Sequence, residues 1–147
     1  MISKAKLLKL VFNPSLMLIE LWKKIPIGPF ELRLALDIFN RPPYAYCTYH
    51  AAQQAKQLGI NRISVIEFGV AGGLSLVELE GISEAVSRET NVDIDVYGFE
   101  LSTGLPNPVD YRDLPYVFQE GFYKMDVDSL KKRLRKAILR KRLLRER

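Results

Sequence analysis

The apolar positions between residues 60 and 100 change their spacing twice, and this change predicts a sequence of elements. A first run is rich in β-branched and apolar residues, which is typical of a strand buried on both faces of a sheet. Its apolar members are Ile63, Val65, Ile66 and Phe68. A turn follows at Gly69, Gly72 and Gly73, where the backbone is free to approach a ligand closely. From Leu74 the apolar residues return at helical spacing; they are Leu74, Val77, Ile82, Ala85 and Val86. The pattern predicts strand, glycine turn and helix.

A second strand is predicted from the alternation in Asp93-Ile-Asp-Val-Tyr-Gly-Phe-Glu100. A helix between two strands usually makes a right-handed crossover, so the two strands are expected to be parallel and to end at the same sheet edge. The glycine turn and Glu100 are therefore expected to face one crevice. A carboxylate in that position accepts hydrogen bonds from the two hydroxyls of a ribose in dinucleotide-binding folds.

The N-terminal third is predicted to be helical, in pieces separated by prolines. We expect helices over residues 3–12, 14–24, 30–39 and 44–58, with breaks at Asn13-Pro14, residues 25–29 and Arg41-Pro-Pro43. The apolar face of the second piece suits either a membrane surface or, more often, cover by the rest of the domain or by a second subunit. In the fourth piece, Tyr46, Tyr49 and His50 are spaced to lie on one side, as part of a substrate pocket or as aromatic packing against the sheet.

The segment after the second strand, residues 101–125, is too aromatic for a disordered linker. It is expected to be an ordered loop at the ligand edge, as a lid, a substrate wall or a simple cover. A further helix is expected to start near Asp128 or Ser129 as N-cap.

Charge divides the chain unequally. The net charge is +5, but residues 131–147 carry ten basic residues and one acid, which leaves residues 1–130 with 12 basic and 16 acidic residues. The basic character therefore belongs to a helical tail and does not indicate a nucleic-acid-binding domain. One cysteine, Cys47, and one histidine, His50, exclude an internal disulfide and argue against a structural zinc site, so no metal site is expected. This cysteine usage, with no signal peptide or spanning segment in the sequence, favours a cytoplasmic protein.

Two motifs together resemble the class I S-adenosylmethionine-dependent methyltransferases, in particular the macrocin O-methyltransferase-like group. They are Glu67-Phe-Gly-Val-Ala-Gly-Gly73 and Tyr97-Gly-Phe-Glu-Leu-Ser-Thr-Gly-Leu-Pro106. The resemblance covers about residues 40–130. It implies a Rossmann-like α/β fold and S-adenosyl-L-methionine as cofactor, with Glu67, Gly69 and Gly72 bordering its methionine part, Gly73 opening the helix and Glu100 holding the ribose. The implied cofactor-binding set is Glu67, Gly69, Val70, Ala71, Gly72, Gly73 and Glu100.

The sequence departs from the family pattern in its glycine spacing and in having Glu at position 100 where Asp is commoner. A nicotinamide-binding fold is the nearest competitor, although it usually lacks an acid at the position of Glu67. Only two strands are predicted, followed by a basic helix, so the methyltransferase domain is expected to be incomplete after the second strand. The expected organisation is an N-terminal helical extension over 1–40, the first half of a methyltransferase-like domain over 41–130 and a basic helical tail over 131–147.

The full family transfers a methyl group to an oxygen of a small-molecule acceptor, and no residue of this chain is assigned as catalytic base. An incomplete domain would lack the adenine pocket and acceptor site, so activity of the chain itself is left open. The rival hypothesis is a non-enzymatic helical module that binds a membrane surface or nucleic acid through its basic tail. Nucleic acid and membrane are the less favoured partners, and the N-terminal helices offer a surface for a homo-oligomer.

Overall fold

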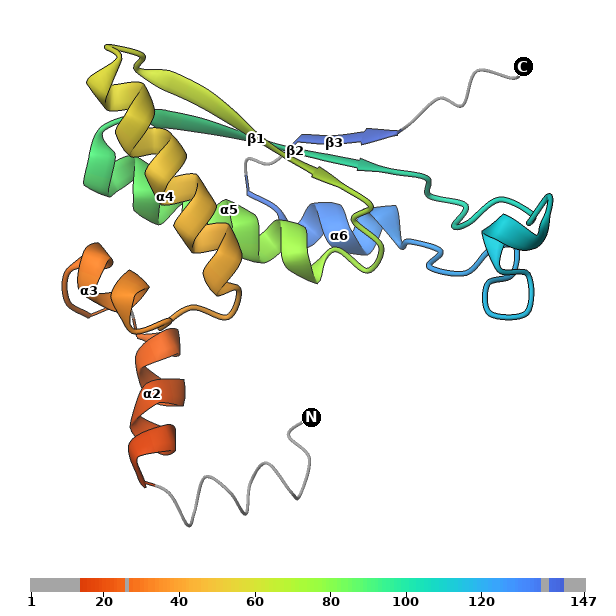
Figure 1. The fold of residues 1–147 in the computed structure, drawn as a ribbon, viewed down its shortest axis with the longest axis horizontal. Helices are drawn as coiled ribbons and strands as arrows, with labels where there is room; N and C mark the ends of the chain where they lie inside the picture. Colours follow the sequence, from red (N-terminus) through yellow and green to blue (C-terminus); the bar gives the residue numbers. More distant parts are fainter. Residues whose placement is uncertain (1–13, 26, 136–137, 142–147) are drawn as a thin grey trace.

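The computed structural model describes residues 14–25, 27–135 and 138–141, and it shows a mixed α/β protein with a parallel sheet (Figure 1). The elements in chain order are α2 (Pro14–Lys24), α3 (Phe30–Ala35), α4 (Pro42–Gln57), β1 (Arg62–Phe68), α5 (Leu74–Thr90), β2 (Asp93–Glu100), the 3-10 helix η1 (Tyr111–Asp113), α6 (Val127–Arg133) and β3 (Ile138–Lys141). The predicted helix over 3–12 lies outside the described residues. No helix in the described part of the chain is both long and apolar enough to cross a membrane.

The predicted strand–turn–helix–strand unit is confirmed. β1 and β2 pair in parallel from Arg62↔Asp93 to Phe68↔Phe99, and α5 connects them. Both strands therefore end at the same edge of the sheet, as the crossover rule requires.

The prediction of only two strands is wrong, and the helix expected after them is present but does not continue through the basic tail. α6 ends at Arg133, Leu134 has an extended backbone (φ −79°, ψ 141°), and residues Ile138–Lys141 form a third strand parallel to β2. The strand order is β1-β2-β3, so β2 is central and its backbone is paired on both sides. Because β2 presents free N–H and C=O groups along that edge, pairing with them overrides the helical spacing of the leucines in this segment. Residues 142–147 of the expected tail lie outside the described residues.

The sheet is covered on one face. Helices α4, α5 and α6 all lie on the same side of it (Figure 1). Burial in β1 alternates accordingly: Glu67 is buried, whereas Ile66 and Phe68 are 51% and 74% exposed. The prediction of a strand buried on both faces was therefore wrong, because no described element packs on the second face.

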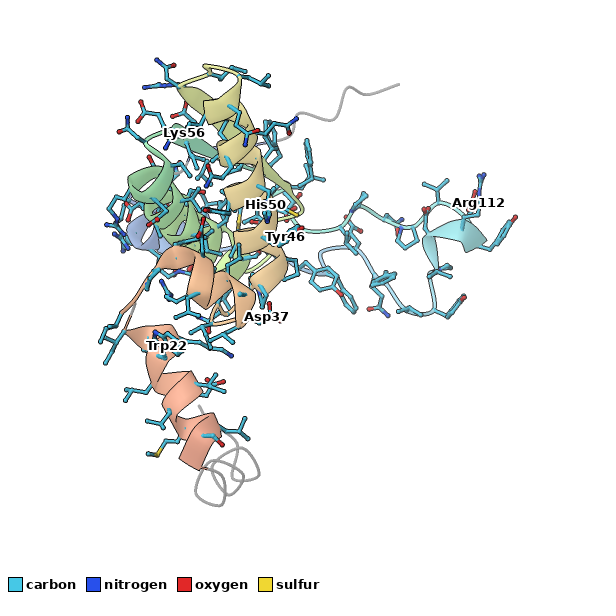
Figure 2. All side chains as sticks on the ribbon, turned by 60° about the vertical axis from the view of Figure 1, so that its left-hand side comes forward. Trp22, Asp37, Tyr46, His50, Lys56 and Arg112 are labelled. Carbon is cyan, nitrogen blue, oxygen red and sulfur yellow. The ribbon has the colours of Figure 1, made fainter. Side chains whose placement is uncertain are left out.

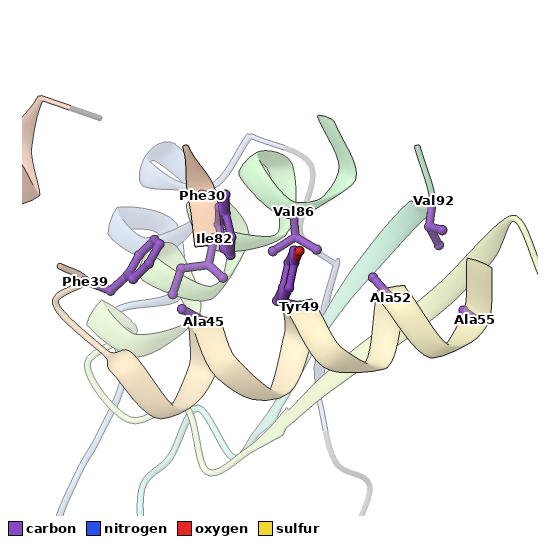
Figure 3. Packing of buried hydrophobic residues seen from close by; sticks show 9 residues of the cluster. All are labelled: Phe30, Phe39, Ala45, Tyr49, Ala52, Ala55, Ile82, Val86 and Val92. Carbon is purple, nitrogen blue, oxygen red and sulfur yellow. The ribbon is translucent and has the colours of Figure 1, made fainter. Parts of the chain in front are cut away.

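Two apolar clusters fill the space between the helices and the sheet. The first joins α3, α4 and α5 and is shown in Figure 3; its buried members are Phe30, Phe39, Ala45, Tyr49, Ala52, Ala55, Ile82, Val86 and Val92. The second joins the glycine turn, α5, β2 and α6; its buried members are Val70, Leu76, Leu79, Val96, Met125 and Leu130. Phe30 and Phe39 belong to the first cluster although they fall within the segment expected to be an extension.

Several helix boundaries differ from the prediction for local reasons. α3 ends at Ala35 instead of residue 39, because the backbone turns at Asp37 (φ 52°) and the Ile38 N–H bonds back to Arg33. On α5, Leu74 is 69% exposed and the buried stripe begins at Leu76. The N-cap of α6 is Asp126, whose side chain accepts the Ser129 N–H at 2.9 Å, not Asp128 or Ser129.

Residues 101–125 form an ordered projection (Figure 1), as predicted. Its two sides are joined by backbone hydrogen bonds from Leu105 to Phe122 (2.8 Å) and from Gly121 to Leu105 (2.9 Å). Gly104 is required there, because its φ is +85° and a Cβ would lie 2.5 Å from the Phe122 carbonyl oxygen. Below we call residues 101–125 the arm.

Candidate functional site

The turn between β1 and α5 has a backbone shape that depends on its glycines. Gly69 (φ 82°), Ala71 (φ 46°) and Gly73 (φ 77°) all have left-handed backbone angles, which glycine adopts without strain. The Gly69 N–H donates to the Phe99 carbonyl at 3.0 Å and the Gly73 N–H donates to the Val70 carbonyl at 2.9 Å. The turn is thus tied to the end of β2 before α5 begins at Leu74.

Glu100 lies against this turn, as the sequence predicts. Its Oε2 accepts the Ala71 N–H at 2.6 Å and its Oε1 accepts the Leu101 N–H at 2.7 Å. A carboxylate has about four acceptor positions, so two backbone donors leave capacity for the hydroxyl donors of a ligand. The carboxylate therefore both fixes the turn and offers acceptors at the edge of the sheet.

Glu67 comes from β1, and its side chain is on the helix-covered face of the sheet. It is 8% exposed, and its Oε1 accepts the Tyr44 hydroxyl at 3.2 Å. Its Oε2 is buried and has no hydrogen-bond partner among the described residues. A buried carboxylate oxygen without a partner is costly, so this atom is the polar group of the site that a bound donor would stabilise most.

The glycines of the site serve different purposes. A Cβ built at Gly69 or Gly72 meets no atom within 4 Å, so the backbone there is open to approach from outside. A Cβ at Gly73 would lie 2.3 Å from Leu130 Cδ1, and one at Gly98 would lie 2.6 Å from Leu76 Cδ2. Gly73 and Gly98 are therefore needed for packing, whereas Gly69 and Gly72 leave space for a ligand.

The remaining two predicted residues, Val70 and Ala71, belong to the turn itself. Val70 is 2% exposed and its side chain belongs to the second apolar cluster. Ala71 is half-buried and directs its N–H to Glu100. All seven predicted residues thus lie within the turn or on the strand ends beside it.

Helix α6 closes one side of the turn, a contact that no sequence pattern indicates. Leu130 is fully buried over Gly73, and the Arg133 guanidinium donates to the Gly72 carbonyl at 2.8 Å. These contacts join residues about sixty positions apart, and nothing in the local pattern of either segment identifies the partner. Tyr44 was likewise missed, because its role depends on α4 crossing the end of β1.

A hollow of about 540 Å³ adjoins Glu67 between α4 and β1. Its lining is mostly apolar, with Tyr44, Cys47, Thr48 and Glu67 as polar members. A second hollow of about 630 Å³ lies within the arm and is lined by Leu105, Pro106, Asn107, Pro108, Val109, Asp113, Phe118 and Tyr123. Both volumes suit a small molecule.

The aromatic group on α4 does not form one surface. Tyr49 is buried against Phe30 and donates its hydroxyl to Glu31, whereas Tyr46 and His50 are exposed and their rings contact each other in a tilted arrangement, with 4.2 Å between the centroids. Figure 2 shows Tyr46 and His50 on the outer side of α4. The three rings are neighbours as predicted, since Tyr49 meets His50 edge-on at 5.5 Å between centroids, but only Tyr49 serves as aromatic packing, against Phe30 of α3. Within the described ranges, no three His, Cys, Asp or Glu side chains are grouped as metal ligands would be.

Burial raises the pKa of Tyr44 above its ordinary value of 10.0, and the negative charge of Glu67 and the hydrogen bond to it act in the same direction. A phenol beside a carboxylate keeps its proton because the phenolate would be both desolvated and repelled. Tyr44 is therefore a hydrogen-bond donor to Glu67 throughout the physiological range.

Replacing Tyr44 by Phe is expected to lower the free energy of unfolding by about 1 kcal/mol at neutral pH, because Glu67 loses its donor. The wild-type protein should also lose stability as the pH rises above 10, since a raised pKa means that the folded state holds the proton more tightly than the unfolded state. Part of that loss should disappear in Tyr44→Phe. The rest should remain, because burial also raises the pKa of Tyr49, which this variant keeps. Urea unfolding at neutral and alkaline pH measures both effects. Tyr46→Phe, at an exposed tyrosine, is the control, and equal losses in the two variants would contradict the role of Tyr44.

No family model matches the chain, and the searches of curated proteins and of solved structures likewise find no match.

Proposed function

We propose that the chain is a methyltransferase-like protein with a Rossmann-like fold whose cofactor is S-adenosyl-L-methionine. One observation carries the proposal: the Glu100 carboxylate lies 2.6 Å from the Ala71 N–H of the glycine turn, so an acceptor group and an open backbone turn share one edge of the sheet. A nucleoside with two adjacent hydroxyls suits this pairing.

The residues present fit the proposed cofactor. Gly69 leaves open space where the ribose or the methionine part approaches, and Glu67 Oε2 is a buried acceptor without a hydrogen-bond partner among the described residues. Glu100 would accept the ribose hydroxyls, and Glu67 would face the methionine part. When bound, S-adenosylmethionine supplies a methyl group activated on a sulfonium.

The chain's own contribution to methyl transfer would be alignment. In the full family the acceptor is an oxygen nucleophile on a small molecule, and holding it in line with the methyl group is the main source of rate. The 540 Å³ hollow that Glu67 helps to line offers space for such an acceptor. None of the described residues is assigned as catalytic base.

The rival function, binding of nucleic acid or membrane through a basic helical tail, has less support. The expected helix does not continue through Ile138–Lys141, which form β3. Two of the basic residues are also engaged within the molecule: Arg133 with the Gly72 carbonyl, and Arg135 with Glu84 at 2.9 Å.

Calorimetric titration of the full chain with S-adenosylmethionine tests the proposal. We expect saturable binding in the wild-type chain and affinity weakened at least about tenfold in Gly69→Arg, because the side chain fills the open space beside the turn. Gly59→Arg is the matched control, since Gly59 also has a positive φ (73°) and open surroundings but lies beyond the end of α4.

Absence of binding in the wild-type chain, or equal weakening in both variants, would overturn the proposal. Binding of NAD with no affinity for S-adenosylmethionine would assign the site to the nicotinamide-binding class. Binding of RNA that is unaffected by Gly69→Arg would favour the rival.

A further inference from the structure

Helix α2 carries an apolar stripe that faces solvent. Met17, Leu18 and Leu21 fall on one side of the helix by their spacing, and Ile25 comes directly after its last residue; the four are 53%, 62%, 50% and 45% exposed. Ile27, just beyond the helix, is 67% exposed. A contiguous row of exposed large apolar residues on one helix marks an interaction surface more often than a bare solvent face.

Among the described residues, the body of the protein does not cover this stripe. α2 stands away from the sheet and from α4 and α5 (Figure 1), and it makes none of the larger contacts between elements. Figure 2 shows Trp22 at the end of α2 nearest the body. The Trp22 indole N–H donates to the Ile27 carbonyl at 2.6 Å and so fixes the helix end to its linker. The described elements therefore do not supply the cover by the rest of the domain that the sequence offered as one alternative, and cover by a second subunit, the other alternative, stays a prediction.

The net charge of the N-terminal segment of the sequence indicates which partner would cover the stripe. Lys23 and Lys24 end the helix, and residues 1–25 contain five lysines and one acid, Glu20, which already pairs with Lys23 at 3.3 Å. If the stripe of a second copy packed on this stripe, residues 1–25 of the two copies, each with a net charge of +4, would come together, and their repulsion would oppose association. A surface of anionic lipid attracts the same charge and also accepts the apolar side chains.

We propose that α2 docks the protein on anionic membranes. The helix lies in the plane of the interface, with Met17, Leu18 and Leu21 among the acyl chains and the lysine ammonium groups at the lipid phosphates and carboxylates. This inference is independent of the cofactor site and holds whether or not S-adenosylmethionine binds.

Co-sedimentation of the full chain with vesicles tests the proposal. We expect binding to phosphatidylcholine mixed with phosphatidylserine and weaker binding to phosphatidylcholine alone. At about 1 M salt, where charges are screened beyond about 3 Å, binding to the mixed vesicles should fall to the level of phosphatidylcholine alone. Trp22 is the only tryptophan of the chain, so its emission should shift to shorter wavelength on the anionic vesicles.

Paired variants separate the two contributions. Leu18→Gln/Leu21→Gln should weaken the partition at least about tenfold while keeping helix propensity. Its control is Tyr111→Gln/Tyr116→Gln, at residues of the arm that are even more exposed. Lys23→Gln/Lys24→Gln should remove much of the preference for anionic vesicles, and Lys131→Gln/Lys132→Gln, on the exposed side of α6, should remove less of it.

Three results would overturn the proposal. One is the absence of binding to either vesicle. Another is binding that Leu18→Gln/Leu21→Gln does not weaken. The third is a dimer in light scattering that dissociates in that variant while Trp22 emission does not respond to vesicles, which would assign the stripe to a second copy of the chain.

Discussion

Replacing Leu130 by Ala is expected to lower the free energy of unfolding by about 2–5 kcal/mol, the range for removing a fully buried leucine. Leu130 is inaccessible to solvent and packs in the cluster that joins the glycine turn to β2. Because its side chain lies directly over Gly73, the loss should also loosen α6 from the turn. Urea unfolding followed by circular dichroism measures the cost.

A double-mutant cycle with Gly73→Ala tests whether the two residues act on each other. The new Cβ would lie 2.3 Å from Leu130 Cδ1, so the single variant should be strongly destabilised by overpacking in addition to strain at φ 77°. The combined variant should lose less free energy of unfolding than the sum of the two single losses, because the shortened side chain at position 130 leaves room for the new methyl group. The backbone strain at residue 73 is the same with either residue at position 130, so it cancels in the cycle. Additive losses would show that Gly73 is required only for its backbone angle.

Replacing Glu100 by Gln is expected to cost about 2 kcal/mol of stability, because hydrogen bonds to a charged acceptor are among the stronger ones. The amide would keep one acceptor and turn its NH₂ group toward the second backbone N–H, at Ala71 or Leu101. Affinity for S-adenosylmethionine should fall at least about tenfold under conditions where the variant is fully folded. The measurements are urea unfolding and calorimetric titration.

Glu120→Gln, on the exposed part of the arm, is the control for the loss of one negative charge. A destabilised Glu100→Gln protein with unchanged cofactor affinity would limit Glu100 to holding the turn. Unchanged stability and affinity together would contradict both roles.

The strand–turn–helix–strand unit was predictable because its signals are local. Glycines separate two apolar runs, and the spacing of the apolar residues changes from that of a strand to that of a helix at the turn. Because a helix connects the two strands, the strands are expected to be parallel. These facts alone predict Glu100 beside the turn, and the structure agrees: residue 100 is the last of β2, and the Gly69 N–H donates to the Phe99 carbonyl. The prediction therefore needed no knowledge of side-chain packing.

The features that the sequence did not predict depend on distant partners. Ile138–Lys141 contain two basic residues and continue a leucine spacing typical of a helix, and they become a strand because β2 has a free edge at Tyr97–Glu100. Burial of only one sheet face depends in the same way on where the helices pack, not on the composition of β1. Leu130 over Gly73 and Tyr44 beside Glu67 also arise from tertiary contacts.

The detached position of α2 has a thermodynamic consequence. Since few contacts connect it to the two apolar clusters, the helix can unravel and re-form without opening the cooperative unit formed by the sheet and α4–α6. The free-energy cost of ordering the helix is then local, so a surface that stabilises the helical form has to offset only that cost and leaves the remainder of the protein undisturbed.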